Sequence, residues 1–204
     1  MNKLLLTFAI ILIPIYSFSK EISFSVGPNW GVPIHYRFVT GGPEKELKTG
    51  FNVNSEYIFL SDKKISWGAN IGFQHNPIKI TPEFTGQTEV IPHTEFCNMW
   101  YFSPKMIFRK RPASNFSLNP LVSFQINASD ENSFSNQSGI GLGMSFVKKF
   151  NLNEKSYIKI EPAISVFNII PFAGFDLTER MTSIGINVGW GTRIDLKQKS
   201  EILP

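Results

Sequence analysis

Apolar and polar residues alternate along this chain with a period of two, and the alternation is longest at residues 21–38. Even positions in this segment are apolar or proline, while the odd positions, apart from Pro33, are small, polar or charged. Successive side chains of a β-strand point to opposite faces, so the pattern predicts a strand with one apolar and one polar face. Segment 21–38 is therefore expected to separate two different environments.

Seven further segments repeat this alternation, and we predict eight strands in total. After 21–38 they are 50–60, 65–75, 96–108, 116–127, 139–147, 157–167 and 183–196. Three connections are tight, at 61–64, 109–115 and 148–156, and they alternate with longer ones at 39–49, 76–95, 128–138 and 168–182. Short turns on one rim and long loops on the other are typical of outer-membrane barrels, whose short turns face the periplasm.

The bulkier face of these strands is expected to meet lipid. All four tryptophans, Trp30, Trp67, Trp100 and Trp190, lie on the apolar parity. An eight-stranded lumen is only just wide enough for side chains to fill, and the Gly, Ser and Asn of the opposite face suit such an interior. The pattern thus predicts an all-β, eight-stranded antiparallel up-and-down transmembrane barrel. A secreted soluble barrel of the lipocalin type, with its apolar face turned inward around an apolar ligand, remains an alternative because it alternates too.

Residues 1–19 have the features of an export signal. Lys3 precedes an apolar run at 4–16, and Ser17 and Ser19 supply the small residues of a cleavage site. The run is shorter than the roughly 20 apolar residues that a membrane-spanning helix needs. We therefore expect a cleaved signal peptide at 1–19, a barrel at 20–196 and a short periplasmic tail at 197–204.

Composition mainly excludes other classes of protein. The 19 phenylalanines favour strands, and the net charge of +4 is modest. No basic stripe interleaved with aromatic residues indicates a nucleic-acid partner. No cofactor or metal is expected, because the histidines show no recurring ligand spacing. Cys97 is the single cysteine, and its place on the polar parity predicts a buried thiol.

The pattern over residues 20–196 resembles the small eight-stranded outer-membrane barrels of Gram-negative bacteria, the OmpA/OmpX-like group and related barrels of Bacteroidota. Gly191, Ile194 and Leu196 also fit the Gly-x-x-apolar-x-apolar signal by which barrel-assembly machinery recognises a last strand. The chain departs from the enterobacterial pattern because it continues to Pro204 and lacks a terminal phenylalanine. The resemblance implies a monomeric, multi-pass protein of the cell outer membrane, with outer-membrane lipids and the assembly machinery as partners.

Charged residues of the predicted strands fall on the inner parity and indicate a network inside the lumen. Its candidate members are Arg37, Glu56, Lys105, Lys159, Glu161 and Arg193. Buried charges have to be paired and hydrogen-bonded. We interpret these residues as a structural plug, with a proton or ion path as the alternative. A general diffusion channel is disfavoured because eight strands leave little open pore.

The two rims of the predicted barrel differ in charge. The long loops carry the acidic residues Glu83, Glu89, Glu95, Asp130, Glu131, Asp176 and Glu179. The tight turns carry the basic residues Lys63, Lys64, Arg109, Lys110, Arg111, Lys148 and Lys149. As hypotheses, the acidic rim holds divalent cations or a partner, and the basic rim meets anionic phospholipid headgroups.

The favoured function is a structural, adhesive or partner-binding role through the long loops, toward a surface protein or a glycan. The alternative is a lipid A-modifying enzyme, since some eight-stranded barrels have that activity and His35, His75 and His93 fall near the long-loop rim. A deacylase of this class places a serine two residues after its histidine, but here those positions are Arg37, Pro77 and Glu95. We therefore assign no catalytic residue.

Overall fold

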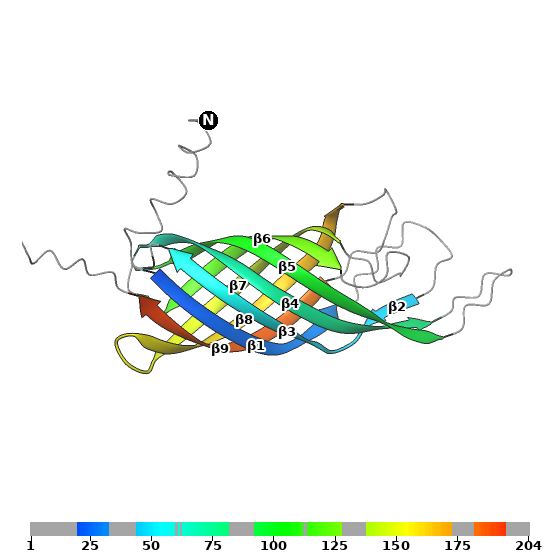
Figure 1. Ribbon diagram of the computed structural model, residues 1–204, viewed down its shortest axis with the longest axis horizontal. Coiled ribbons are helices and arrows are strands. Elements are labelled where there is room, and N and C mark those ends of the chain that lie inside the picture. The colour runs from blue at the N-terminus through cyan, green and yellow to red at the C-terminus, as the bar shows by residue number, and fades with distance from the viewer. Residues whose placement is uncertain are drawn as a thin grey trace, which may run out of the picture.

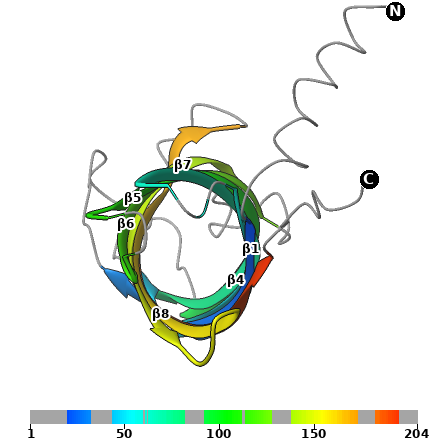
Figure 2. The same ribbon diagram turned by 90° about the vertical axis from the view of Figure 1, so that its left-hand side faces the viewer.

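The computed structural model describes residues 20–32, 44–59, 61, 63–81, 92–111, 114–127, 138–172 and 182–194. These residues form one antiparallel sheet, and eight of its strands close into a barrel (Figures 1 and 2). The predicted leader and tail, together with Arg37 and Leu196, lie outside the described residues. Within the described part of the chain, no helix is both long and apolar enough to cross a membrane.

Each barrel strand pairs with the barrel strands that precede and follow it in the sequence, and the last pairs with the first. The strands are β1 (Lys20–Val32), β3 (Gly50–Phe59), β4 (Ile65–Thr81), β5 (His93–Arg109), β6 (Phe116–Asn127), β7 (Gly139–Asn151), β8 (Ser156–Pro171) and β9 (Thr182–Ile194). All of these pairings are antiparallel. The predicted eight-stranded antiparallel up-and-down barrel is confirmed.

A short additional strand, β2 (Glu44–Leu47), was not predicted. It pairs with the last four residues of β4, just beyond the point where β3 begins. Between β2 and β3, the backbone N–H of Lys48 donates to the carbonyl oxygen of Pro77 of β4 at 2.8 Å. The predicted long connection at 39–49 therefore contains a strand that the sequence pattern missed, because backbone pairing with β4 needs no alternation of side chains.

The predicted long connection at 76–95 is also wrong at both of its ends. β4 and β5 are 17 residues long each, and they remain paired from Ile65↔Phe108 to Ile80↔His93. A tilted strand crosses a membrane with about 9–11 residues. The β4–β5 hairpin therefore extends beyond the barrel, at the right of Figure 1. The alternating segments therefore underestimate the length of these strands, because backbone hydrogen bonding between β4 and β5 continues beyond them.

The two ends of the barrel are distinguished by its connections. Lys20 at the start of β1 pairs with both Phe59 and Ile194, so the first and last barrel strands meet at the rim that carries the tight turns. This rim, at the left of Figure 1, is called the periplasmic rim because short turns face the periplasm in such barrels. The opposite end, with β2 and the β4–β5 hairpin, is called the extracellular end.

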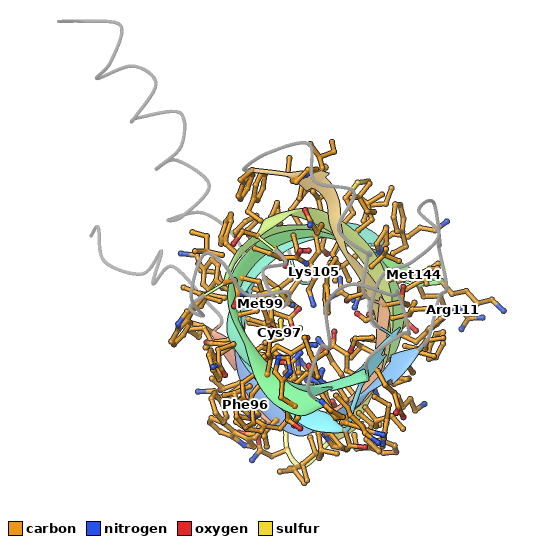
Figure 3. All side chains as sticks on the ribbon, turned by 90° about the vertical axis from the view of Figure 1, so that its right-hand side faces the viewer. Phe96, Cys97, Met99, Lys105, Arg111 and Met144 are labelled. Carbon is orange, nitrogen blue, oxygen red and sulfur yellow. The ribbon has the colours of Figure 1, made fainter. Side chains whose placement is uncertain are left out.

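Every barrel strand exposes large apolar side chains on its outer face, while the inner face is mostly Ser, Asn, Gln, Lys and Glu. Figure 3 shows Phe96 and Met144 outside the ring of strands and Lys105 inside it. Soluble monomers rarely expose contiguous apolar patches larger than a few hundred Å². The outer surface is therefore suited to hydrocarbon, and the polar lumen argues against the lipocalin-like alternative.

Candidate functional site

Four of the charged residues predicted for the lumen meet inside the barrel. They are Glu56 on β3, Lys105 on β5, and Lys159 and Glu161 on β8. Lys105 Nζ lies 2.5 Å from Glu56 Oε1 and 3.5 Å from Glu161 Oε1. Lys159 Nζ lies 2.5 Å from Glu56 Oε2 and 2.9 Å from Glu161 Oε2. Each ammonium thus bridges both carboxylates, and we call this arrangement the charge ring.

The charge ring is buried and electrically balanced. Its four side chains are at most 4 % exposed, and two ammonium groups face two carboxylates. Ser23 Oγ donates to Glu56 Oε2 at 3.2 Å, and Ser145 Oγ donates to Glu161 Oε1 at 2.7 Å. Buried charges cost several kcal/mol each unless partners and hydrogen bonds compensate them. The ring supplies both, so it can stand in the lumen as a plug.

Arg193 does not join the charge ring. It belongs to a second set of residues, the periplasmic group, centred on Glu21 of β1. Arg193 Nε lies 3.8 Å from Glu21 Oε1, Lys149 Nζ is ion-paired with Glu21 Oε2, and Tyr157 Oη donates to the same oxygen at 3.1 Å. Lys149 Nζ also lies 4.5 Å from the centre of the Tyr157 ring. Sequence reasoning missed Glu21, Lys149 and Tyr157 as partners, although the odd position of Glu21 already placed it on the inner parity.

Two residues predicted for the basic turns lie inside the barrel instead. Arg109 ends β5 and Lys149 stands near the end of β7, and their residues are only 5 % and 6 % exposed. Arg109 Nη1 donates to Ser66 Oγ at 2.6 Å and to the carbonyl oxygen of Lys63 at 3.0 Å. The strands run further than predicted, and the period of two then turns both side chains inward.

A polar cavity of about 40 Å³ lies in the lumen beside the charge ring. Its lining includes Glu161 of the ring together with Asn54, Asn70, Gln74, Ser123 and Asn187. The side-chain oxygens of Asn70 and Asn187 are buried, and neither has a hydrogen-bond partner within the described residues. Since one water needs roughly 10–15 Å³ of such space and polar partners, the cavity suits a few water molecules.

An apolar cluster lies inside the barrel toward the extracellular end, and we call it the apolar cap. It consists of Ile78, Cys97, Met99 and Phe167, all buried. Phe167 is placed by an irregularity of β8, whose register with β7 shifts between Ile140 and Leu142. The next residue, Asn168, has φ 48° and is also buried. The thiol of Cys97 is thus packed among apolar side chains.

The four tryptophans all point outward, with 39–55 % of each residue exposed. Trp100 packs against Phe73 on the neighbouring strand, with ring centres 5.0 Å apart. Of the predicted assembly signal, Ile194 is exposed on the outer face, while Gly191 faces inward against Tyr157. A Cβ atom at Gly191 would lie 2.4 Å from the Tyr157 ring, so glycine is required for this packing.

Two of the three histidines that motivated the enzyme alternative, His75 and His93, are described, and neither belongs to the charge ring. His75 on β4 stands between the rings of Phe51 and Phe96, at 5.3 and 5.4 Å, and its Nδ1 lies 2.6 Å from Asn98 Oδ1. An amide, rather than a serine hydroxyl, thus neighbours this imidazole. His93 Nε2 lies 3.1 Å from Glu95 Oε1, and His35 falls outside the described residues. Within that part of the chain, no cluster of three His, Cys, Asp or Glu residues is placed to hold a metal.

No protein-family model matches the sequence, and no curated protein matches it either. Several solved structures of outer-membrane proteins are similar to this structure. Outer membrane protein OprG of Pseudomonas aeruginosa is 11 % identical with a TM-score of 0.48, covering 88 % of this chain and 97 % of its own. Neisserial surface protein A is 10 % identical with a TM-score of 0.49, covering 86 % and 97 %. Ail, the attachment invasion locus protein of Yersinia pestis, is 16 % identical with a TM-score of 0.41, covering 87 % and 99 %.

Proposed function

We propose that this outer-membrane-type barrel is a closed, non-conducting membrane protein whose working surface is its extracellular end. The observation that carries the proposal is the charge ring, in which each of two lysines binds both of two glutamates inside the lumen. A ring of mutually neutralised charges anchors four side chains across the lumen. It therefore favours a structural plug over an ion or proton path.

The rest of the lumen supports a closed barrel. The buried apolar cap lies toward the extracellular end, and the periplasmic group lies between the charge ring and the periplasmic rim. The cavity beside the ring measures only about 40 Å³. Eight-stranded barrels in general have interiors just wide enough for side chains to fill. Diffusion of solutes through this lumen is therefore disfavoured.

The extracellular end offers a hydrogen-bonded sheet as a surface for a partner. β2, β4 and β5 continue as a three-stranded sheet beyond the length that a membrane requires. Binding residues are found disproportionately on loops that a rigid scaffold positions. The proposed role is thus structural, adhesive or partner-binding, toward a surface protein or a glycan.

Export and assembly belong to the same proposal. The leader at 1–19 is removed, the mature chain enters the outer membrane as a monomer, and the assembly machinery reads Gly191, Ile194 and Leu196. Pairing of β9 with β1 over most of its length supports this role, because barrel closure depends on the last strand. Sequencing the amino terminus of protein purified from the membrane tests the cleavage, with Lys20 as the expected first residue.

Planar-bilayer recording tests the closed lumen. The purified full chain should insert without steady conductance steps, at either polarity and in molar salt. A fourfold alanine variant removes the charge ring by replacing Lys105, Glu56, Lys159 and Glu161. It should show conductance steps more frequently than the unaltered chain, because four side chains that fill the lumen are lost. Stable conductance steps from the unaltered chain would refute a closed lumen.

The surface role is tested by display on bacteria that do not otherwise adhere. Adhesion of displaying cells to cultured epithelial cells is compared with that of a variant in which residues 80–93 are replaced by Asn-Gly. This two-residue turn joins Lys79 to Thr94, which are paired in the hairpin, and keeps Ile78 in the apolar cap. Adhesion that is present with the full chain and lost with the variant supports the role. Equal adhesion of cells displaying the full chain, cells displaying the variant and non-displaying cells contradicts it.

A further inference from the structure

Lys148 is an exposed lysine on the outer, lipid-facing side of β7. Phe146 and Phe150 flank it on the same face of the strand, and both are exposed. Across the sheet, Lys148 pairs with Phe116 of β6 and with Ile160 of β8, which are exposed apolar residues too. The ammonium is therefore carried on a surface that is otherwise apolar in all four directions.

The side chain of Lys148 leans toward the periplasmic rim. Its Nζ lies 6.0 Å from the centre of the Phe150 ring, and Phe150 is the next outward residue in that direction. A lysine near a membrane boundary lays its methylene stem along apolar surface and extends its ammonium to the headgroup layer. A charge left in hydrocarbon costs roughly 2–4 kcal/mol at the midplane and about 0–1 near the interface.

The turn that adjoins this part of β7 carries further cations. The backbone N–H of Lys149 donates to the carbonyl oxygen of Asn115 at 2.7 Å, so the β5–β6 turn adjoins this part of β7. That turn carries the exposed residues Lys110 and Arg111, and Figure 3 shows Arg111 pointing away from the barrel. The described residues of the periplasmic rim include three more exposed cations, Lys63, Lys64 and Lys155, and one exposed carboxylate, Glu154. The described part of this rim is therefore mainly positively charged.

We infer that Lys148, with Lys110 and Arg111 of the adjoining turn, binds the phosphate of an anionic phospholipid in the periplasmic leaflet. The inference rests on the proposed function, since it needs the barrel to span the membrane. The phenylalanines around Lys148 contact the acyl chains, while the three cations contact the phosphate. Two kinds of contact from one lipid molecule distinguish this site from a free phosphate site.

Native mass spectrometry of the detergent-solubilised full chain tests the site. The probes are phosphatidylglycerol and phosphatidylcholine with identical acyl chains, mixed in equal amounts. One lysine near the surface of an anionic membrane contributes enough for about a fivefold preference. The unaltered chain should retain phosphatidylglycerol at least about fivefold over phosphatidylcholine, and Lys148→Gln should lower this ratio about fivefold. Lys148→Arg should restore the ratio.

Lys79→Gln is the matched control, because Lys79 is an exposed lysine of β4 at the extracellular end. It removes the same charge and should leave the ratio unchanged. Soluble glycerol phosphate should not displace the retained lipid, and displacement would indicate a free phosphate site instead. An unchanged ratio in Lys148→Gln, or an equal loss in Lys79→Gln, would overturn the inference.

Insertion into vesicles of pure phosphatidylcholine separates this inference from the proposed function. A heat-modifiable band on cold-detergent gels reports a folded barrel, and it does not depend on anionic lipid. If the chain inserts and folds there but shows no preference for phosphatidylglycerol, only the lipid site is wrong. If it does not insert at all, the proposed membrane barrel is wrong as well.

Discussion

Lys105 on β5 and Glu56 on β3 are in direct contact, Nζ to Oε1 2.5 Å, although β4 lies between their strands. Lys159, on the far side of the barrel, reaches the other oxygen of the same carboxylate. Glu56 therefore links strands that share no backbone hydrogen bonds. Such contacts hold the lumen across its width, whereas the sheet alone holds it around its circumference.

Removing one partner of this contact should destabilise the folded barrel. Lys105→Met leaves two carboxylates and one ammonium in the buried ring, and removal of one partner of a buried pair typically destabilises by about 3–5 kcal/mol. The double variant Lys105→Met, Glu56→Gln restores charge balance and should recover much of this loss. Urea unfolding in lipid vesicles measures the free energy of unfolding of the single and the double variant. Lys79→Met, at the exposed extracellular end, is the control and should change the free energy of unfolding by no more than about 0.5 kcal/mol. An equally small change for Lys105→Met would contradict the buried ring.

Gly191 should not tolerate a methyl group. Its Cβ would lie 2.4 Å from the Tyr157 ring, and the tyrosine is held in turn by its hydrogen bond to Glu21. Overpacking of this kind typically costs about 1–3 kcal/mol. Gly185→Ala, on the same face of β9, has its nearest contact at 3.2 Å and should cost clearly less. Equal unfolding midpoints for the two variants would show that Tyr157 does not restrict this position.

Tryptophan fluorescence should report lipid contact. All four indoles point outward from the barrel, so brominated acyl chains should quench the emission of the chain in vesicles, and aqueous acrylamide should quench it weakly. The same acrylamide titration on the urea-unfolded chain is the reference for full exposure. Strong acrylamide quenching and no bromine quenching would mean that the outer face does not contact lipid.

Asn168 should resist replacement by a β-branched residue. Its φ of 48° lies in the left-handed region, where residues other than Gly, Asn and Asp are disfavoured by about 1–2 kcal/mol. Asn168→Gly and Asn168→Val both remove the amide, but only valine adds the backbone strain. The valine variant should therefore unfold at a lower urea concentration than the glycine variant. Its free energy of unfolding should be smaller by about 1–2 kcal/mol. The reverse order would argue against backbone strain at Asn168, the residue that follows Phe167 of the apolar cap in β8.

Several features were predictable from the sequence because they depend on local geometry alone. Side chains alternate across a strand with a period of two, so the outward Trp67 and the inward Lys105 follow from parity without knowledge of the partners. The tight turn at 61–64 likewise followed from the interval between two alternating segments. The same parity would have placed Arg109 and Lys149 inside, had the strands been extended by a few residues.

Which inward charges meet was decided by closure of the sheet. Strand stagger brings Glu56, Lys105, Lys159 and Glu161 to one level, and it leaves Arg193 with Glu21 nearer the periplasmic rim. Parity assigns a face, but distance across a lumen depends on the tilt and register of all eight strands together. The pairing of β2 with β4 and the length of the β4–β5 hairpin likewise rest on backbone hydrogen bonds, which leave no trace in the order of apolar and polar side chains.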